Sequence, residues 1–99
     1  MSDNIQNNDQ TPDNEEGMVS GEILTEIVEN QLENNYPLKV KETLMRLRMT
    51  GVEREEAVMY IGCALAVELV DVAENGNPFD EKRYTTNLEL LPEMPWAEE

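Results

Sequence analysis

Two carboxylates near the middle of the chain, Glu68 and Asp71, are the residues best placed to do chemistry. At helical spacing Glu68 shares a face with four apolar residues. These are Val58, Ile61, Leu65 and Val72. A carboxylate on such a face is partly buried and has to be hydrogen-bonded, paired or protonated. It would then act as a general acid or base, bind a hard metal ion beside Asp71, or form a structural ion pair. We favour a structural role, either a pair with Arg46, Arg48 or Arg83 or a partly exposed edge position, because structural pairs perturb carboxylates as readily as active sites do.

The chain has one cysteine, Cys63, and no histidine. A nucleophilic cysteine needs a neighbouring base or cation that lowers its pKa, and no histidine exists to provide one. We therefore expect Cys63 to be a small buried packing residue. The same composition argues against a transition-metal site, and no glycine-rich phosphate loop or Ser-His-Asp set is present. We expect no catalytic residue, no cofactor and no bound metal.

The C-terminal segment offers a candidate binding surface. Trp96 lies close to Met94 and Leu91 in a proline-rich stretch. Tryptophan is enriched at the energetic centres of interfaces, so these three residues are possible partner contacts. Trp96 is also a natural lid for a small core that lacks buried area, and we favour the lid. The stretch itself is too short and too rich in proline for another helix.

The charge of the chain disfavours several classes of partner. Twenty-two acidic residues against seven basic ones give a formal net charge of −15, and residues 1–35 contain no Lys or Arg. Phosphate contacts need clustered cations, so this balance disfavours nucleic acid and anionic lipid. It favours a basic partner. Residues 1–17 hold almost no apolar side chains, and we expect them to be a disordered acidic tail.

From residue 18 onward the spacing of apolar residues predicts a single all-α domain of four helices. The expected ranges are about 20–34, 37–50, 53–75 and 80–91. Ser20 and Asp80 are suited to cap helix starts, and Gly51 and Gly76 to close helix ends. No segment alternates with the period of a strand.

The third helix is apolar on nearly every side between Ala57 and Ala73. A helix of this kind is covered by partners on most sides, so we expect it to be the buried centre of the domain, wrapped by the other three helices. Gly62 and its small neighbours allow another helix to approach closely. We expect that helix to come from the same chain, with a second subunit as the alternative. Core filling is the default expectation for the methionines.

From residue 40 onward the chain resembles a group of small bacterial all-helical domains of unknown function. The resemblance depends on Glu42-Thr43-Leu44, Arg46-Leu47, Gly51, Arg54 to Ala57, Ile61-Gly62, Leu65, Glu68-Leu69, Pro78-Phe79-Asp80, Arg83-Tyr84 and Leu91-Pro92. Some members carry SEC-C-type zinc motifs, which are absent here, as is a histidine in the central helix. The resemblance implies a helical fold and a bacterial cytoplasmic setting. It implies no activity.

These observations predict a small acidic cytoplasmic protein that is not an enzyme. We expect a protein–protein interaction or regulatory module with another protein as its partner. The alternative is an acidic nucleic-acid mimic or decoy that binds a basic partner. A third hypothesis is an enzyme or ligand-binding domain that uses Glu68 and Asp71 in a concave pocket. A homodimer is possible, because about 75 ordered residues supply only a few kcal/mol of net stability. The apolar run is interrupted by charges, so we expect no membrane span.

Overall fold

The computed structural model describes residues 20–97 of the chain. It contains four α-helices, α1 (Gly21–Asn34), α2 (Leu38–Met49), α3 (Arg54–Asn75) and α4 (Glu81–Leu90), followed by a short 3-10 turn, η2 (Pro95–Ala97). No strand occurs within these residues, which confirms the all-α fold class. Each helix begins and ends within one residue of its expected range. The predicted acidic tail, residues 1–17, lies outside the described residues.

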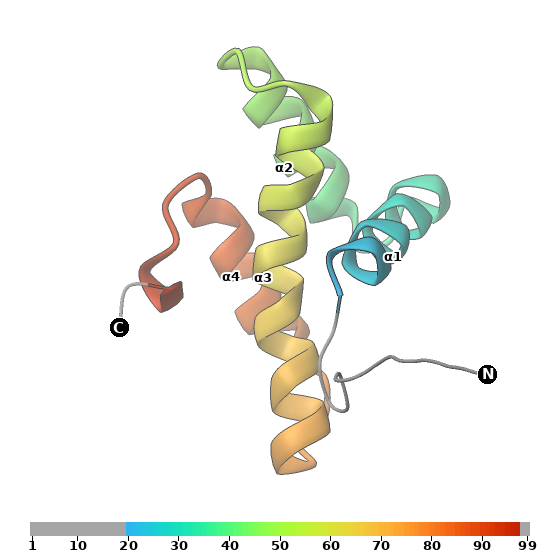
Figure 1. Ribbon diagram of the computed structural model, residues 1–99. Helices are drawn as coiled ribbons and strands as arrows, with labels where there is room; N and C mark the ends of the chain where they lie inside the picture. The colour runs from blue at the N-terminus through green and yellow to red at the C-terminus, as the bar shows by residue number, and fades with distance from the viewer. Residues whose placement is uncertain (1–19, 98–99) are drawn as a thin grey trace, which may run out of the picture.

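Helix α3 is the central element, and α1, α2 and α4 each pack against it (Figure 1). α2 also contacts α1 and α4. The fully buried apolar residues come from all four helices and from Leu91. They are Val28, Val40, Leu47, Ala57, Val58, Ile61, Ala64, Leu65, Tyr84, Leu88 and Leu91. On α3 these residues recur every three or four positions, so that one face of the helix forms the floor of the core.

Local signals set the helix boundaries. The hydroxyl of Ser20 accepts a hydrogen bond from the Ile23 amide at 3.1 Å, and the carboxylate of Asp80 accepts one from the Arg83 amide at 3.0 Å. Both residues are thus side-chain N-caps. Gly51 and Gly76 follow α2 and α3 with positive φ, as expected for residues that close a helix.

Three further local features add to these signals or depart from them. Asn35, with φ of 57°, ends α1 in the left-handed conformation, and the Tyr36 amide then donates to the Gln31 carbonyl at 3.1 Å. This is the Schellman arrangement, which asparagine tolerates almost as glycine does. Glu53 occupies the N-cap position of α3 but makes no side-chain capping bond. Residues Pro95–Ala97 form a 3-10 turn where no element was expected.

Among the described helices, none has the length and unbroken apolar character that are needed to cross a bilayer.

Candidate functional site

Glu68 projects from the core face of α3 and is 0% exposed. The guanidinium of Arg83, in the first turn of α4, donates to both of its oxygens, with Nε–Oε2 at 2.5 Å and Nη2–Oε1 at 2.9 Å. The Asp80 amide donates to Oε1 at 3.2 Å. Of the three arginines considered as partners, Arg83 is therefore the one that pairs with Glu68. Every oxygen of this buried carboxylate is engaged by donors that belong to the fold.

Asp71 lies one turn further along α3 and shares the same arginine. Its Oδ2 accepts from Arg83 Nη2 at 2.9 Å, while its Oδ1 accepts from the side-chain amides of Asn75 at 2.7 Å and Asn77 at 3.0 Å. The Asn75 hydrogen bond, followed by the Arg83 bond, lowers the pKa of Asp71 below its ordinary value. The same two carboxylates raise the pKa of Arg83. A carboxylate with a lowered pKa is a weak base at neutral pH, so in the triad of Glu68, Asp71 and Arg83 the Asp71 side chain is suited to ion pairing and not to proton transfer.

A polar depression of about 400 Å³ lies beside this triad. Its lining is Asp71, Asn77, Pro78, Phe79, Asp80, Glu81 and Arg83. Asp71 and Arg83 do share a concave surface, as the enzyme hypothesis requires, but they are bonded to each other and to their neighbours. Within residues 20–97, no cluster of three metal-ligating side chains is present. The charged groups of Asp71 and Arg83 in this depression are thus already engaged in hydrogen bonds within the fold.

The second candidate site is an apolar seam on the other side of α3. It consists of five residues that follow one another at alternating steps of four and three positions. We call this set of residues the uncovered seam. Its members are Met59, Cys63, Ala66, Val70 and Ala73. Met59 is 63% exposed and Val70 39%, while Cys63 and Ala73 are also exposed and Ala66 is half-buried. No helix of the described part of the chain covers it. The other three helices pack around α3 as expected, but they leave it open along this seam.

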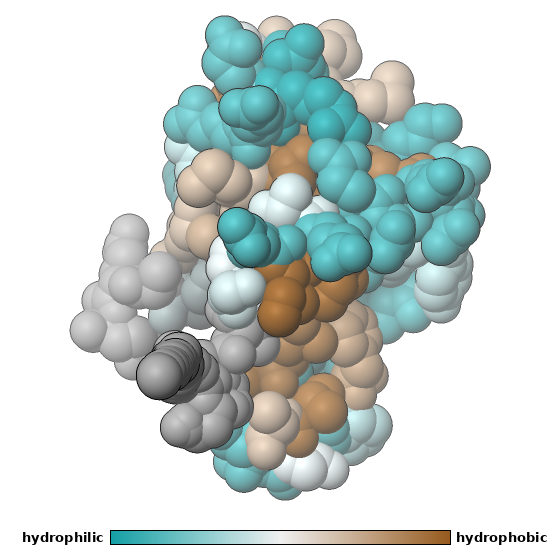
Figure 2. All heavy atoms as spheres, turned by 45° about the vertical axis from the view of Figure 1, so that its right-hand side comes forward, coloured by the Kyte–Doolittle hydropathy of each residue, from teal (hydrophilic) through white to brown (hydrophobic). Residues whose placement is uncertain are grey.

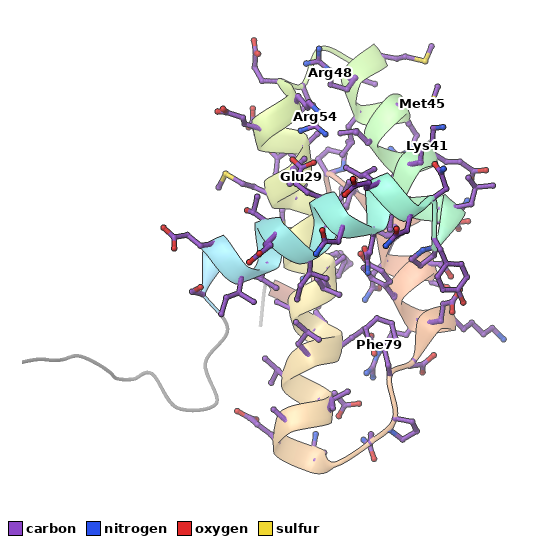
Figure 3. All side chains as sticks on the ribbon, turned by 90° about the vertical axis from the view of Figure 1, so that its right-hand side faces the viewer. Glu29, Lys41, Met45, Arg48, Arg54 and Phe79 are labelled. Atoms are coloured by element: carbon purple, nitrogen blue, oxygen red, sulfur yellow. The ribbon has the colours of Figure 1, made fainter. Side chains whose placement is uncertain are left out.

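The structure corrects two expectations about individual residues of the seam. Cys63 is exposed and is not a buried packing residue. Partial burial nevertheless raises the pKa of its thiol, which leaves it protonated and weakly nucleophilic near neutral pH. Met59 does not fill the core, and neither do Met45 and Met49, which are 55% and 86% exposed on α2. Figure 3 shows Met45 next to Lys41 on α2.

A groove runs between the uncovered seam and α1. Three adjoining hollows meet at Met59 and Thr25, and the narrowest of them, about 120 Å³, is bounded by Leu24, Gly62 and Cys63. At Gly62 the two helices come close together, since a Cβ added there would lie 3.4 Å from the Leu24 Cβ. At Gly62 α3 therefore receives α1 of the same chain, as expected, and room is left beside this contact.

Acidic side chains border this groove. Glu22 and Glu26 line it from α1, and Glu55 lines it from the first turn of α3. Arg54 also lines it, but its guanidinium forms a two-point pair with Glu29, at 2.7 Å and 2.9 Å. Figure 3 shows these two side chains pointing toward one another. The pair lowers the pKa of Glu29. The charge left unpaired around the groove is negative.

Hydrophobic surface is also visible in Figure 2 on the C-terminal half of α3, beside the polar side chains of α1. Ile23 of α1 is 48% exposed, and Val70 of α3 is 39% exposed. Apolar surface thus continues along α3 beyond the groove. Single exposed apolar residues are ordinary on a protein surface, whereas a large contiguous apolar patch is not.

The C-terminal candidates lie elsewhere. Leu91 is 1% exposed and belongs to the core, so it is not a contact for a partner in this structure. Met94 and Trp96 are half-buried and pack against the same core. This arrangement corresponds to the lid, and the exposed edge of Trp96 remains a minor candidate for binding.

Two structural contacts lay beyond the sequence analysis. Arg46 of α2 donates to the carbonyl oxygens of Leu88 and Leu91 at 3.0 Å and 2.8 Å, and so caps the C-terminal end of α4. The hydroxyl of buried Tyr84 donates to Gln31 Oε1 at 2.8 Å. Both contacts join residues more than 40 positions apart. The signal that was available is chemical: a helix end needs donors, and a buried tyrosine hydroxyl needs a partner.

Comparison of the chain with protein-family models, curated proteins and solved structures gives no match.

Proposed function

We propose that this protein is a non-catalytic interaction module that binds another protein through the uncovered seam and the groove beside it. The observation that carries the proposal is the heptad-spaced row of exposed apolar residues on a helix whose opposite face already forms the core. Exposing such a row in water is unfavourable, at roughly 25 cal/mol per Å² of apolar surface. A partner that covers it recovers this free energy. We also propose a cytoplasmic location, in line with a single unpaired cysteine.

Neither alternative function has comparable support. A nucleic-acid mimic needs a continuous acidic face, whereas Lys41 and Arg48 stand exposed on α2 outside any ion pair among the described residues. An enzyme that uses Glu68 and Asp71 needs those carboxylates free to exchange protons or bind a ligand. Both are held by Arg83 and by other donors of the fold.

Site-specific photo-crosslinking in living cells of the source organism tests the proposal. A benzophenone amino acid replaces Met59 in one variant and Met45 in another; these residues are comparably exposed on different helices. We expect the variant at position 59 to give one discrete adduct in which mass spectrometry maps the cross-link to a single segment of a partner. The variant at position 45 should not give that adduct. The proposal fails if position 59 yields no discrete adduct or the same products as position 45.

A further inference from the structure

We infer that the segment that occupies the uncovered seam is a cationic amphipathic helix of another protein; this inference rests on the proposed function. Alternating steps of four and three residues are the spacing at which a second helix packs along a first. The seam spans 14 residue steps, or roughly 21 Å at about 1.5 Å per residue. A partner helix of four turns covers that length.

The sizes of the side chains along the seam indicate where large side chains of the partner fit. Met59 and Val70 stand out, while Cys63, Ala66 and Ala73 are small. Beside Cys63 the hollow bounded by Leu24 and Gly62 has a volume of about 120 Å³. Engineered apolar cavities of roughly 150 Å³ accept benzene-sized molecules. A Leu side chain from the partner would therefore be anchored at Cys63, in the middle of the seam.

The charges around the seam determine the character of the partner's flanks. Glu55 and Glu74 lie at the two ends of the seam, and Glu22 and Glu26 border the groove at its side. At flanking positions of packed helices, charges of opposite sign select the partner. Lys or Arg on both flanks of the incoming helix would complement all four carboxylates.

The same charges oppose a second copy of this chain. An antiparallel pair of α3 helices that sets Met59 against Val70 and Cys63 against Ala66 also sets Glu55 against Glu74 of the other copy. A parallel pair sets each of these glutamates against its own counterpart. Like charges at such positions are repulsive, and the chain as a whole carries −15. The seam therefore fits a basic helix better than it fits itself.

Two synthetic helical peptides test this inference against the full-length protein. Each has about 18 residues with Leu at its seam positions, a length that extends slightly beyond the seam. One carries Lys at the flanking positions and the other Glu. Fluorescence anisotropy should show at least tenfold tighter binding of the Lys peptide, with an affinity that decreases as salt increases.

A matched pair of variants separates seam binding from general attraction to an acidic protein. Met59→Glu and Met45→Glu add the same charge at comparably exposed positions. We expect Met59→Glu to weaken binding of the Lys peptide at least tenfold, although the extra negative charge should increase long-range attraction. Met45→Glu should leave the affinity within twofold of wild type. Circular dichroism melts verify that both variants fold, and alkylation of Cys63 with N-ethylmaleimide should produce the same loss as Met59→Glu.

Several results would overturn the inference. These are equal binding of the two peptides, no binding of the Lys peptide, equal effects of the two variants, and a wild-type dimer that Met59→Glu converts to a monomer. The photo-crosslinking experiment distinguishes this failure from failure of the proposed function. An adduct at position 59 that maps to an acidic or uncharged segment of another protein would support the proposed function. The same adduct would contradict the inference that the partner segment is a cationic helix.

Discussion

Arg83 in the first turn of α4 holds the fully buried carboxylate of Glu68 on α3 through two hydrogen bonds. The arginine remains partly exposed and also reaches Asp71. Because Asp80 caps α4 and donates its amide to Glu68, the start of α4 is fixed on α3 by both backbone and side chain. The clamp explains why a charged residue is tolerated in the core face of the central helix.

Replacing Glu68 by Gln should therefore destabilise the fold without unfolding it. Hydrogen bonds to charged groups contribute roughly 1.5–3 kcal/mol, and we expect a loss of about 2 kcal/mol in the free energy of unfolding measured by urea denaturation. Arg83→Met should lower the free energy of unfolding by more than this, because it leaves the buried Glu68 carboxylate with the Asp80 amide as its one remaining donor among the contacts described. Glu74→Gln, an exposed neighbour on the same helix, should stay within about 0.5 kcal/mol of wild type. Equal effects of Glu68→Gln and Glu74→Gln would contradict the clamp.

Stability should decrease in acid because of two carboxylates in particular. The pKa values of Glu29 and Asp71 are lowered in the folded protein from ordinary values of 4.5 and 3.8. Groups whose pKa is lowered by folding stabilise it fully above their unfolded pKa, and this stabilisation is lost as pH falls through the folded values. We expect the free energy of unfolding to decrease below about pH 4.5. Protonation of unpaired surface carboxylates relieves charge repulsion and acts in the opposite direction.

The comparison that isolates the two groups uses the double variant Glu29→Gln/Asp71→Asn. It should be less stable than wild type at pH 7 and should show a shallower loss between pH 5 and pH 3, in roughly 0.15 M salt to limit long-range repulsion. Parallel pH profiles for the two proteins would show that these pKa shifts do not contribute to acid unfolding.

Gly62 should tolerate alanine. An added Cβ would make an ordinary van der Waals contact with Leu24 at 3.4 Å, and alanine is the better helix former by roughly 0.5–1 kcal/mol. We expect Gly62→Ala to raise the free energy of unfolding by up to this amount, whereas Gly62→Leu should push α1 away and lower it. Because the methyl group enters the hollow beside Cys63, Gly62→Ala should also weaken binding of the Lys peptide. A less stable Gly62→Ala variant would show that α1 and α3 are closer than the structure indicates.

The sequence was sufficient for the helices because their signals are local. Ser20 and Asp80 cap the starts of α1 and α4, and Gly51 and Gly76 follow the ends of α2 and α3. Each of these boundaries depends on only a few adjacent residues, and regular apolar spacing marks the helix between them. The burial of Glu68 was also visible, since four apolar residues share its helical face. The sequence narrowed the partner of Glu68 to three arginines but could not select Arg83. That choice depends on how α4 lies across α3, which no local pattern encodes.

The uncovered seam was beyond sequence analysis for a physical reason. Periodicity shows that Met59, Cys63 and Val70 are apolar, but it does not show how many neighbours the chain can place around one helix. Three short helices cover only part of a helix of 22 residues, and the remaining side stays open within the described residues. The expectation of a wrapped α3 assumed that apolar character and coverage coincide. Along this seam they do not.

The contact of Arg46 with α4 gives the last prediction. Its two hydrogen bonds go to the Leu91 carbonyl, which directly follows α4, and to the Leu88 carbonyl, which also accepts from the Leu91 amide at 3.2 Å. Lysine cannot reproduce this two-point geometry, so Arg46→Lys should loosen the end of α4 and the tail that carries Trp96. Trp96 is the only tryptophan of the chain and packs against the core, so its fluorescence reports the position of the tail. We expect a red-shifted emission and faster amide exchange at residues 88–94. Arg48→Lys is the matched control, because Arg48 bonds only to the nearby Val52 carbonyl among the described residues. An unchanged spectrum in Arg46→Lys, or an equal shift in Arg48→Lys, would mean that apolar packing of Met94 and Trp96 holds the tail without the arginine.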